Sequence, residues 1–378
     1  MSKNSTIHLG IVGACGRGSS FKAACNALPQ VCIRAVCDVD AGGLPAAAER
    51  LGATDQYTDY DDMLERSTLD AVILATPMPF HAPQAVAALQ QNLHVFSEVP
   101  AAVSVEECRA LTLAANASDG IYMMGENYTY RKENVLIREL VRQGLFGETY
   151  YAEGEYLHEL KEYDERRLAA RGISSDQVWR RHWQNGIDGI TYGTHSLGPI
   201  LQWMPKDRVI SVCCQGSGHH YLDPDGKPYA QDTSVMLCNM QKGGLVKIRV
   251  DMISNRPHAM TNYQLQGTTG CYESARARGD KSRIWLRDAG GDAVEWTNLS
   301  ALEEAYLPSW WQASDAVKAG HGGGDYFELL DFVAAIEGRK PPTIGVHEAL
   351  GMTLPGLISQ QSIAEGGETL EVPDSRKW

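Results

Sequence analysis

Tyr192 and His195 are of two side-chain types that can transfer protons. They are three residues apart, which places both on one face if the segment is helical. A phenol and an imidazole that face a bound substrate can pass protons to and from adjacent carbon atoms. The alternative for each is structural: His195 as a hydrogen-bonded packing histidine, and Tyr192 as a core tyrosine with its hydroxyl at the rim.

A glycine-rich run follows the first apolar stretch of the chain. Residues 10–18 read Gly-Ile-Val-Gly-Ala-Cys-Gly-Arg-Gly, and such a turn lets backbone amides and a helix N-terminus meet a pyrophosphate. The pattern G-x-G-x-x-G expects glycines at positions 13, 15 and 18. Cys15 replaces the middle glycine, with Gly16 beside it, so a plain tight turn is the alternative.

Asp38 ends the second apolar stretch, twenty residues after Gly18. A carboxylate at this position accepts hydrogen bonds from a ribose diol and repels a 2′-phosphate. The residue therefore favours NAD over NADP as the cofactor. Asp40 is the second candidate for this role, and a capping or turn aspartate is the structural alternative.

The elements that must position these residues alternate in the first part of the chain. Short β-branched runs are expected as strands at residues 7–12, 33–38, 71–75, 94–97 and 122–124. The segments between them are expected as helices at residues 20–28, 44–51, 61–66, 83–90 and 105–117. Apolar strands that alternate with helices indicate a parallel sheet covered on both faces.

The pattern changes after about residue 128. Helices are expected at residues 132–143, 186–203, 325–337 and 346–365. Strands are expected at residues 149–157, 209–215, 234–240, 245–254, 262–267 and 283–287. Several strands in succession without helices between them indicate an antiparallel or mixed sheet.

Composition excludes several classes of partner. The formal net charge of −13 argues against nucleic acid or an anionic membrane, because both are held by basic patches. No apolar run approaches the roughly 18 residues of a membrane helix, and no signal peptide is expected.

Nine cysteines without a CxxC pair predict reduced thiols in a cytoplasmic protein. His219 and His220 have no carboxylate or cysteine at ligand spacing, so no metal site is expected.

These motifs together resemble the Gfo/Idh/MocA family of oxidoreductases over nearly the whole chain. The matching stretches are residues 10–18, 37–40, 57–60, 75–77 with His81, 98–100, 126–127, 144–148, 193–195 and 325–342. The resemblance implies an α/β protein with an N-terminal Rossmann domain over residues 1–126. A C-terminal α/β domain with a large open, mostly antiparallel sheet would follow over residues 127–378. It also implies a carbohydrate or polyol substrate between the domains and a homo-oligomer, either a dimer or a tetramer.

The resemblance also implies which residues contact the cofactor. Glu98 is expected at the nicotinamide ribose, Asn127 at that ribose or the substrate, and His81 beside the cofactor cleft. Thr76 and Pro77 would shape its wall, and loop capping is the alternative for this group. The full expected set for NAD is Gly13, Cys15, Gly16, Arg17, Gly18, Asp38, Thr76, Pro77, His81, Glu98, Val99 and Asn127.

Two departures from the family pattern point to one branch of it. Val99 stands where the dehydrogenases usually carry lysine, and Thr191 stands where they carry aspartate. Valine has no titratable group and cannot replace lysine as an acid or base. The Glu-Val-Pro run at 98–100 and the run at 192–199 are similar to the NAD-dependent glycosidases of glycoside hydrolase family 109. Gly193 and Ser196 differ from that branch's pattern, which puts the identity of the substrate in doubt.

That second resemblance implies cleavage of a glycoside without net redox change. Hydride leaves C3 of the sugar for NAD, the C2 proton is removed, the C1 group is eliminated, and water and hydride are then returned. The expected catalytic residues are His195, Tyr192 and Tyr156, with Tyr156 as a candidate general base. The expected substrate contacts are Tyr156, His158, Trp179, Arg180, Tyr192 and His195.

Several readings of the function and of the substrate residues remain open. A net NAD-dependent sugar or polyol dehydrogenase is the first alternative function, and a non-catalytic protein that senses sugar or NAD is the second.

The substrate residues also have structural alternatives. If Tyr156 does not contact substrate, it is a packing residue of its strand, and if His158 does not, it faces solvent. Trp179 and Arg180 are expected in a loop that either stacks on sugar or only covers the cleft. Residues 320–325 are expected as a flexible loop at the cleft mouth that touches ligand through His321.

Overall fold

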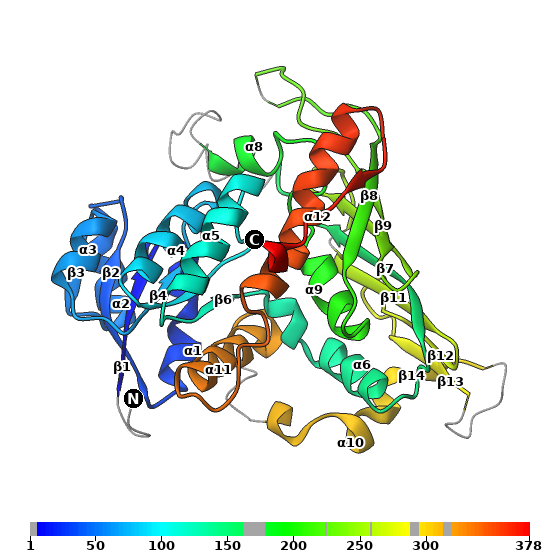
Figure 1. The fold of residues 1–378 in the computed structure, drawn as a ribbon, viewed down its shortest axis with the longest axis horizontal. Coiled ribbons are helices and arrows are strands. Elements are labelled where there is room, and N and C mark those ends of the chain that lie inside the picture. Colours follow the sequence, from blue (N-terminus) through cyan, green and yellow to red (C-terminus); the bar gives the residue numbers. More distant parts are fainter. Residues whose placement is uncertain (1–5, 162–177, 224, 258, 288–294, 313–318) are drawn as a thin grey trace. The chain divides into compact units, whose positions relative to one another are not determined.

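The computed structural model describes residues 6–161, 178–223, 225–257, 259–287, 295–312 and 319–378. The chain divides into two compact units, shown in sequence colours in Figure 1. Unit 1 comprises residues 1–131, 309–350 and 375–378, and unit 2 comprises residues 132–308 and 351–374. Each unit therefore combines segments that are far apart in sequence. The expected division into domains 1–126 and 127–378 stays a prediction.

Unit 1 contains a six-stranded sheet in which every described pairing is parallel. Its strand order is β3-β2-β1-β4-β5-β6, so the chain winds outward in both directions from β1. The strands are β1 (Ile7–Val12), β2 (Val31–Cys37), β3 (Asp55–Tyr57), β4 (Ala71–Leu74), β5 (His94–Ser97) and β6 (Tyr122–Met124). All four residues of β4 are buried, as a strand covered on both faces requires. The predicted N-terminal Rossmann fold is confirmed.

Helices from both ends of the sequence cover this sheet. They are α1 (Lys22–Asn26), α2 (Leu44–Leu51), α3 (Tyr60–Arg66), α4 (His81–Gln90), α5 (Val105–Ala117) and α11 (Gly324–Ile336). The ring of Phe96 on β5 packs between Phe21 and Phe332, with ring centroids 5.6 Å away on either side. Since Phe332 belongs to α11, the late helix is part of the core of unit 1.

The helix expected at residues 20–28 differs in the structure. It begins as a 3-10 turn, η1 (Arg17–Phe21), and continues as α1 only to Asn26. The hydroxyl of Ser19 donates a hydrogen bond to the carbonyl oxygen of Ala14. Such a bond from a serine side chain to the backbone competes with regular α-helix formation. Helical structure therefore begins at Arg17, within the glycine-rich run.

Unit 2 contains a nine-stranded sheet among the described residues, in the order β14-β13-β12-β11-β7-β10-β9-β8-β15. The strands are β7 (Thr149–Leu157), β8 (Val209–Gly216), β9 (Ser234–Met240), β10 (Leu245–Asp251), β11 (Met260–Gly267), β12 (Gly270–Glu273), β13 (Arg283–Leu286), β14 (Thr297–Asn298) and β15 (Leu370–Glu371). Among the described strand pairings of this nine-stranded sheet, only the β7–β10 pair is parallel. The predicted second, mostly antiparallel sheet is confirmed. The strands β3, β12, β14 and β15 were not expected, because two to four residues carry no readable alternation.

The helices of unit 2 correct two expectations. They are α6 (Lys132–Arg142), α8 (Trp179–Trp183), α9 (Thr194–Trp203), α10 (Glu303–Tyr306) and α12 (Val346–Ala364), the last of which begins in unit 1. The helix expected at residues 186–203 starts only at Thr194, because Gly189 has φ +103° and breaks the helical path. The stretch at 179–183, expected as a loop, forms the short helix α8.

A close approach between α9 and β7 depends on one glycine. An added Cβ at Gly154 would lie 2.8 Å from the Cβ of Ser196 and 3.1 Å from its carbonyl oxygen. Any larger residue at this position in β7 would push α9 away from the sheet. The sequence feature that lets α9 lie on β7 is therefore a strand glycine.

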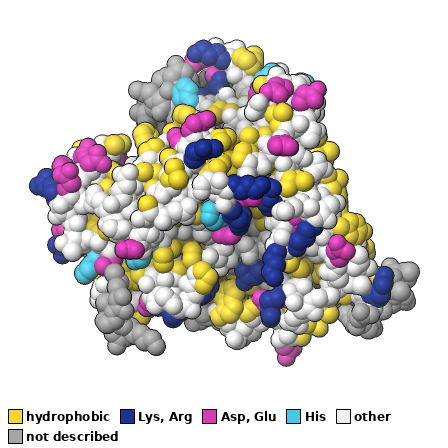
Figure 2. Space-filling model, viewed as in Figure 1, with side chains coloured by type: hydrophobic (Ala, Val, Ile, Leu, Met, Phe, Trp, Pro, Cys, Tyr) yellow, Lys and Arg dark blue, Asp and Glu magenta, His cyan; other side chains and the backbone are white. Residues whose placement is uncertain are grey.

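The surface carries charges of both signs. On the face drawn in Figure 2, acidic side chains lie next to basic ones. None of the helices within the described residues is long and apolar enough to cross a membrane.

Candidate functional site

The glycine-rich turn after β1 has no room for side chains at two of its positions. Gly13 has φ +80°, and an added Cβ would lie 2.4 Å from the carbonyl oxygen of Ala75. An added Cβ at Gly18 would lie 2.7 Å from the Cγ2 of Ile11 and 2.8 Å from the Gly13 carbonyl oxygen. Both positions therefore require glycine, which keeps the backbone of the turn accessible to a ligand.

Cys15 occupies the place of the missing middle glycine. Its backbone N–H donates to Oδ2 of Asp38 at 2.8 Å. Burial, followed by the neighbouring charge of Asp38, raises the pKa of the Cys15 thiol to about 11. The thiol therefore stays protonated at neutral pH and adds no charge to the turn.

Asp38 follows β2 and ties the end of that strand to the turn. Besides Cys15, it accepts a hydrogen bond from the backbone N–H of Asp40 at 3.0 Å. The carboxylate of Asp40 in turn accepts from the N–H of Gly43 at 3.0 Å. Each carboxylate oxygen of Asp38 accepts one of these bonds and has a further lone pair. Its contact with a ribose diol stays a prediction.

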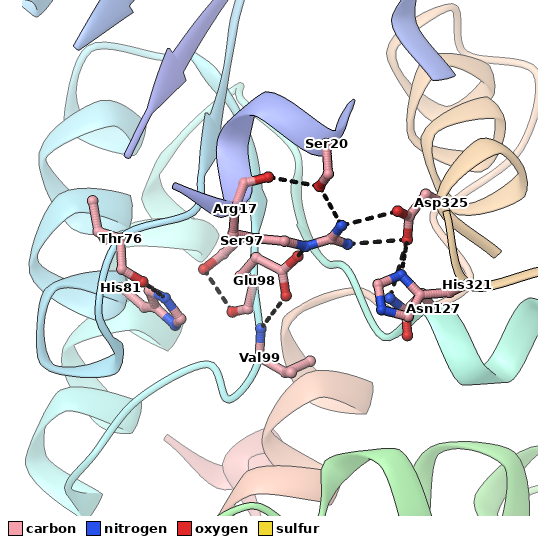
Figure 3. Close-up of polar contacts among 10 residues, drawn as sticks. All are labelled: Arg17, Ser20, Thr76, His81, Ser97, Glu98, Val99, Asn127, His321 and Asp325. Carbon is pink, nitrogen blue, oxygen red and sulfur yellow. Dashed lines mark hydrogen bonds and ion pairs between the residues drawn. The ribbon is translucent and has the colours of Figure 1, made fainter. Parts of the chain in front are cut away.

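Arg17 binds two carboxylates that come from distant parts of unit 1 (Figure 3). Its Nε lies 2.6 Å from Oε1 of Glu98, which follows β5. Its Nη1 and Nη2 donate to the two oxygens of Asp325 at 2.9 and 3.0 Å, a bidentate arrangement. The guanidinium therefore connects the glycine-rich turn to the end of β5 and to the start of α11.

Asp325 is completely buried and has two further partners. His321 Nδ1 lies 2.9 Å away and Asn127 Nδ2 lies 3.1 Å away, both from Oδ1 of Asp325. Burial alone would raise the pKa of this carboxyl. Hydrogen bonds from His321 and Arg17, with the charge of Arg17, instead hold the pKa well below its usual range.

Residues 320–325 have regular structure in place of the expected flexible loop, and contact of His321 with a ligand stays a prediction. Residues His321–Gly323 form the 3-10 turn η8, and the imidazole of His321 is bonded to Asp325. Asp325 itself was missed as a site residue by the sequence reasoning. The available signal was an acidic residue at the start of an apolar helix, four residues after a histidine.

His81 joins two of the turns expected around the cofactor. It is 1% exposed, and its ring nitrogens lie 2.8 Å from the carbonyl oxygen of Pro100 and 2.7 Å from that of Thr76. Burial lowers the pKa of His81 despite these two carbonyl groups, which act in the opposite direction. Its ring thus fixes the walls at Thr76 and at the Glu98-Val99-Pro100 run, where Val99 is 3% exposed.

Asn127 is the expected cofactor residue with an unused polar atom. It begins the 3-10 turn η3 (Asn127–Tyr130) and is 3% exposed. Its Nδ2 binds Asp325, whereas its Oδ1 has no hydrogen-bond partner among the described residues. A buried amide oxygen without a partner is costly, so this atom is suited to accept a hydrogen bond from a ligand.

Within unit 2, the three expected catalytic side chains form an aromatic cluster, although 36 residues separate Tyr156 from Tyr192. The ring centroids are 5.3 Å apart for Tyr156 and Tyr192, 5.5 Å for Tyr156 and His195, and 5.2 Å for Tyr192 and His195. The helical argument for the last pair was wrong, because Tyr192 precedes α9 and its N-cap Gly193. The rings meet because the turn before α9 folds Tyr192 back onto His195.

His158 extends this aromatic cluster. Its Nδ1 lies 2.8 Å from the hydroxyl oxygen of Tyr156, at hydrogen-bond distance. Tyr156 is near the end of β7 and His158 directly follows that strand, and their contact shows that the two side chains lie on the same side as expected. A phenol bonded to an imidazole can pass a proton between the two groups.

Trp179 and Arg180 lie together on α8. The guanidinium carbon of Arg180 is 4.5 Å from the ring centroid of Trp179, and its Nη1 donates to Oε1 of Gln184 at 2.6 Å. These two partners of Arg180 lie on α8 or directly after it. Contact of these two residues with substrate stays a prediction.

His219 and His220 have partners of their own. His219 Nδ1 lies 2.8 Å from the carbonyl oxygen of Tyr229, and His220 Nδ1 lies 2.5 Å from Oδ2 of Asp232. Over the described part of the chain, no group of three or more histidine, cysteine or acidic residues is arranged to hold a metal ion.

Comparisons with known protein families match the two parts of the chain separately. Residues 7–126 match the model described as the oxidoreductase family with an NAD-binding Rossmann fold. Residues 130–378 match the model described as the C-terminal domain of glycosyl hydrolase 109.

Two curated relatives match almost the full chain. A glycosyl hydrolase family 109 protein of Saccharopolyspora erythraea is 30% identical over 98% of this chain and 83% of its own length. A protein of the same description from Shewanella pealeana is 29% identical over 98% of this chain and 86% of its own length.

Solved structures share the fold. Levoglucosan dehydrogenase in complex with NADH and L-sorbose superposes with a TM-score of 0.82 at 18% identity, covering 98% of this chain and 100% of that one. An oxidoreductase of Agrobacterium radiobacter in complex with NAD+, L-tartaric acid and magnesium has a TM-score of 0.76 at 16% identity, covering 97% and 98%. At these identities the likeness concerns the fold alone.

Proposed function

Because the chain belongs to glycosyl hydrolase family 109, we propose that it is an NAD-dependent glycosidase that acts by transient oxidation of a sugar. The substrate would be a glycoside or another small carbohydrate. NAD, when bound, supplies the reversible removal and return of a hydride at C3. Because the hydride is returned, the reaction leaves no net redox change and is a known exception to the use of paired carboxylates.

The residues of unit 1 fit a dinucleotide. The turn at Gly13 and Gly18 has room only for backbone, which suits the close approach of a pyrophosphate. Asp38 would accept a hydrogen bond from a ribose diol. Oδ1 of Asn127, which has no partner among the described residues, would accept one from a second polar group of the cofactor. Glu98, held by Arg17, would orient toward the nicotinamide ribose.

The residues of unit 2 would move the protons. Val99 is buried and apolar, so position 99 supplies no acid or base. We assign proton removal at C2 and proton transfer at the C3 hydroxyl to Tyr156, Tyr192 and His195. The single observation that carries this assignment is the cluster itself, in which all three rings lie within 5.5 Å of one another.

Two other functions use parts of the same residues. A net sugar dehydrogenase would need the same cofactor contacts and is favoured only by the fold of neighbours such as levoglucosan dehydrogenase. A protein that senses sugar or NAD would bind both without turnover. The absence of lysine at position 99 favours the glycosidase over the dehydrogenase.

The deciding experiment offers the purified protein a panel of α- and β-nitrophenyl glycosides in the presence of NAD+. Nitrophenol release and NADH absorbance are recorded in the same sample. The glycosidase releases nitrophenol without accumulating NADH. Stoichiometric NADH without nitrophenol would make the protein a dehydrogenase, and NAD binding without either product would make it a sensor.

The assembly and location are further parts of the proposal. We propose a homo-oligomer, a dimer or a tetramer, that works in the cytoplasm. All nine cysteines are free in the structure, which suits a reducing compartment. Light scattering on the purified full chain measures the oligomer directly, and a monomer at working concentration would contradict this part.

A further inference from the structure

We infer that Asp325 is a positioning residue of the cofactor site: it holds the guanidinium of Arg17, and through Arg17 the carboxylate of Glu98, in the orientation that binds NAD. The inference rests on the proposed function only in taking NAD as the ligand of unit 1. It adds a determinant of cofactor affinity from the C-terminal part of the chain, 308 residues away from Arg17 in sequence.

The geometry around Arg17 leaves it one orientation. Its Nε faces Glu98, and its two terminal nitrogens face the two oxygens of Asp325. A free arginine side chain would lose rotamer entropy when a ligand orders it. The fork with Asp325 orders it in advance, so the binding of a ligand beside the turn does not bear that cost.

The hydrogen bonds of Asp325 reach two of the expected cofactor residues, as a positioning role requires. Its oxygens receive two bonds from Arg17, one from His321 and one from Asn127, so one carboxylate orients two of the expected cofactor residues. Asn127 is held through its nitrogen, which leaves its oxygen partnerless among the described residues. If Asp325 were lost, Arg17 and Asn127 would both be released.

The charges of the cluster agree with this arrangement. Arg17 is surrounded by the carboxylates of Glu98 and Asp325, and by the fully buried Glu328 of α11. Burial, with the nearby charge of Asp325, raises the pKa of Glu328 well above its ordinary value, whereas the pKa of Asp325 is held well below its own. Asp325 is also the residue of α11 that accepts hydrogen bonds from Arg17.

The competing explanation is that Asp325 only stabilises unit 1. The same helix offers a matched control, Asp331, which is 3% exposed and binds the hydroxyl of Tyr130 and the ammonium of Lys340. Both aspartates lie on α11 and lose a buried charge when changed to asparagine. Asp331 contacts none of Arg17, Glu98 or Asn127 among its described partners, so only Asp325 should affect the cofactor.

The experiment titrates NAD+ by calorimetry into the full chain and into four variants: Asp325→Asn, Asp331→Asn, Arg17→Gln and the double variant Asp325→Asn with Arg17→Gln. We expect Asp325→Asn to weaken binding about 10-fold and Asp331→Asn less than about 2-fold, although both lower the melting temperature. If Asp325 acts through Arg17, the double variant binds no more weakly than Arg17→Gln alone. Additive losses, or equal losses for the two aspartates, would overturn the inference.

A milder variant covers the case in which Asp325→Asn does not fold. His321→Gln removes one partner of Asp325 from a side chain that is 33% exposed, and should weaken NAD+ binding by about 2- to 3-fold. No change in affinity for His321→Gln would then count against the inference. Wild-type protein that binds no NAD+ would overturn the cofactor part of the proposed function as well, whereas normal wild-type binding with an unaffected Asp325→Asn overturns this inference alone.

Discussion

The polar network of unit 1 and the aromatic cluster of unit 2 are assembled by different forces. In unit 1, Arg17, Glu98 and Asp325 are joined by charge-assisted hydrogen bonds of 2.6 to 3.0 Å that fix angles as well as distances. In unit 2, Tyr156, Tyr192 and His195 are joined by tilted and edge-to-face ring packing at 5.2 to 5.5 Å.

The polar network of unit 1 and the aromatic cluster of unit 2 are therefore suited to different tasks. A charge network has its donors and acceptors already engaged with one another, so it is suited to orient a ligand. Ring packing positions the side chains through their aromatic faces, and the Tyr156 hydroxyl lies at hydrogen-bond distance from His158, which suits proton transfer. We therefore expect damage in unit 1 to appear as lost affinity or stability, and damage in unit 2 to appear as lost turnover.

The largest effect should follow from a change in the aromatic cluster. Tyr192→Phe or His195→Ala should lower turnover by about 10²- to 10⁴-fold, because each removes a proton-transfer group. NAD+ affinity, measured by calorimetry, should stay within about 2-fold of wild type. Tyr151→Phe is the control, since Tyr151 lies on the same strand β7 and binds Glu153. A variant at either position that retained near wild-type turnover would show that its assigned role is wrong.

A smaller effect is expected at Asp38. Asp38→Ala should weaken NAD+ binding by about 10- to 100-fold and reduce the preference for NAD+ over NADP+, because a charged acceptor is lost. Part of this loss comes from the backbone N–H groups of Cys15 and Asp40, which lose their partner. Affinities for both cofactors are measured side by side with Asp40→Ala. An unchanged preference in Asp38→Ala and a changed one in Asp40→Ala would move the role to Asp40.

The smallest effect concerns stability and its dependence on pH. Glu328 has a raised pKa in the folded protein and an ordinary one, about 4.3, in the unfolded chain. Stability is therefore greatest below that value and falls as pH rises toward the folded pKa, because only the unfolded chain has released the proton. Glu328→Gln removes this loss and should raise the free energy of unfolding at pH 7 by about 1 kcal/mol.

The measurement is denaturant unfolding of wild type and Glu328→Gln from pH 4 to pH 8. The difference between the two should grow with pH. Glu337→Gln, at an exposed position just after α11, is the control and should follow the wild type. A gap that narrowed with rising pH would contradict a raised pKa for Glu328.

Local pattern was enough to predict most of the fold. The apolar runs that became β1, β4, β5 and β6 are buried on both faces, so hydrophobicity alone marked them. It was not enough at residues 186–193, where isolated glycines interrupt an otherwise helical composition. Nor was it enough for the edge strands β3, β14 and β15, which have two or three residues and depend on a neighbour that supplies hydrogen bonds.

The glycine-rich turn and the lack of a titratable group at Val99 follow from residue type and spacing alone, whereas the candidates Tyr156, Tyr192 and His195 came from the resemblance to one branch of a known family. Only the tertiary structure decided that Arg17, Glu98, Asn127, His321 and Asp325 form one network. The reason is physical: a buried charge must find a partner, but the partner can come from any segment that the fold brings within about 3 Å. Separations of up to 308 residues leave no periodic trace in the sequence, so the fold chose the partners.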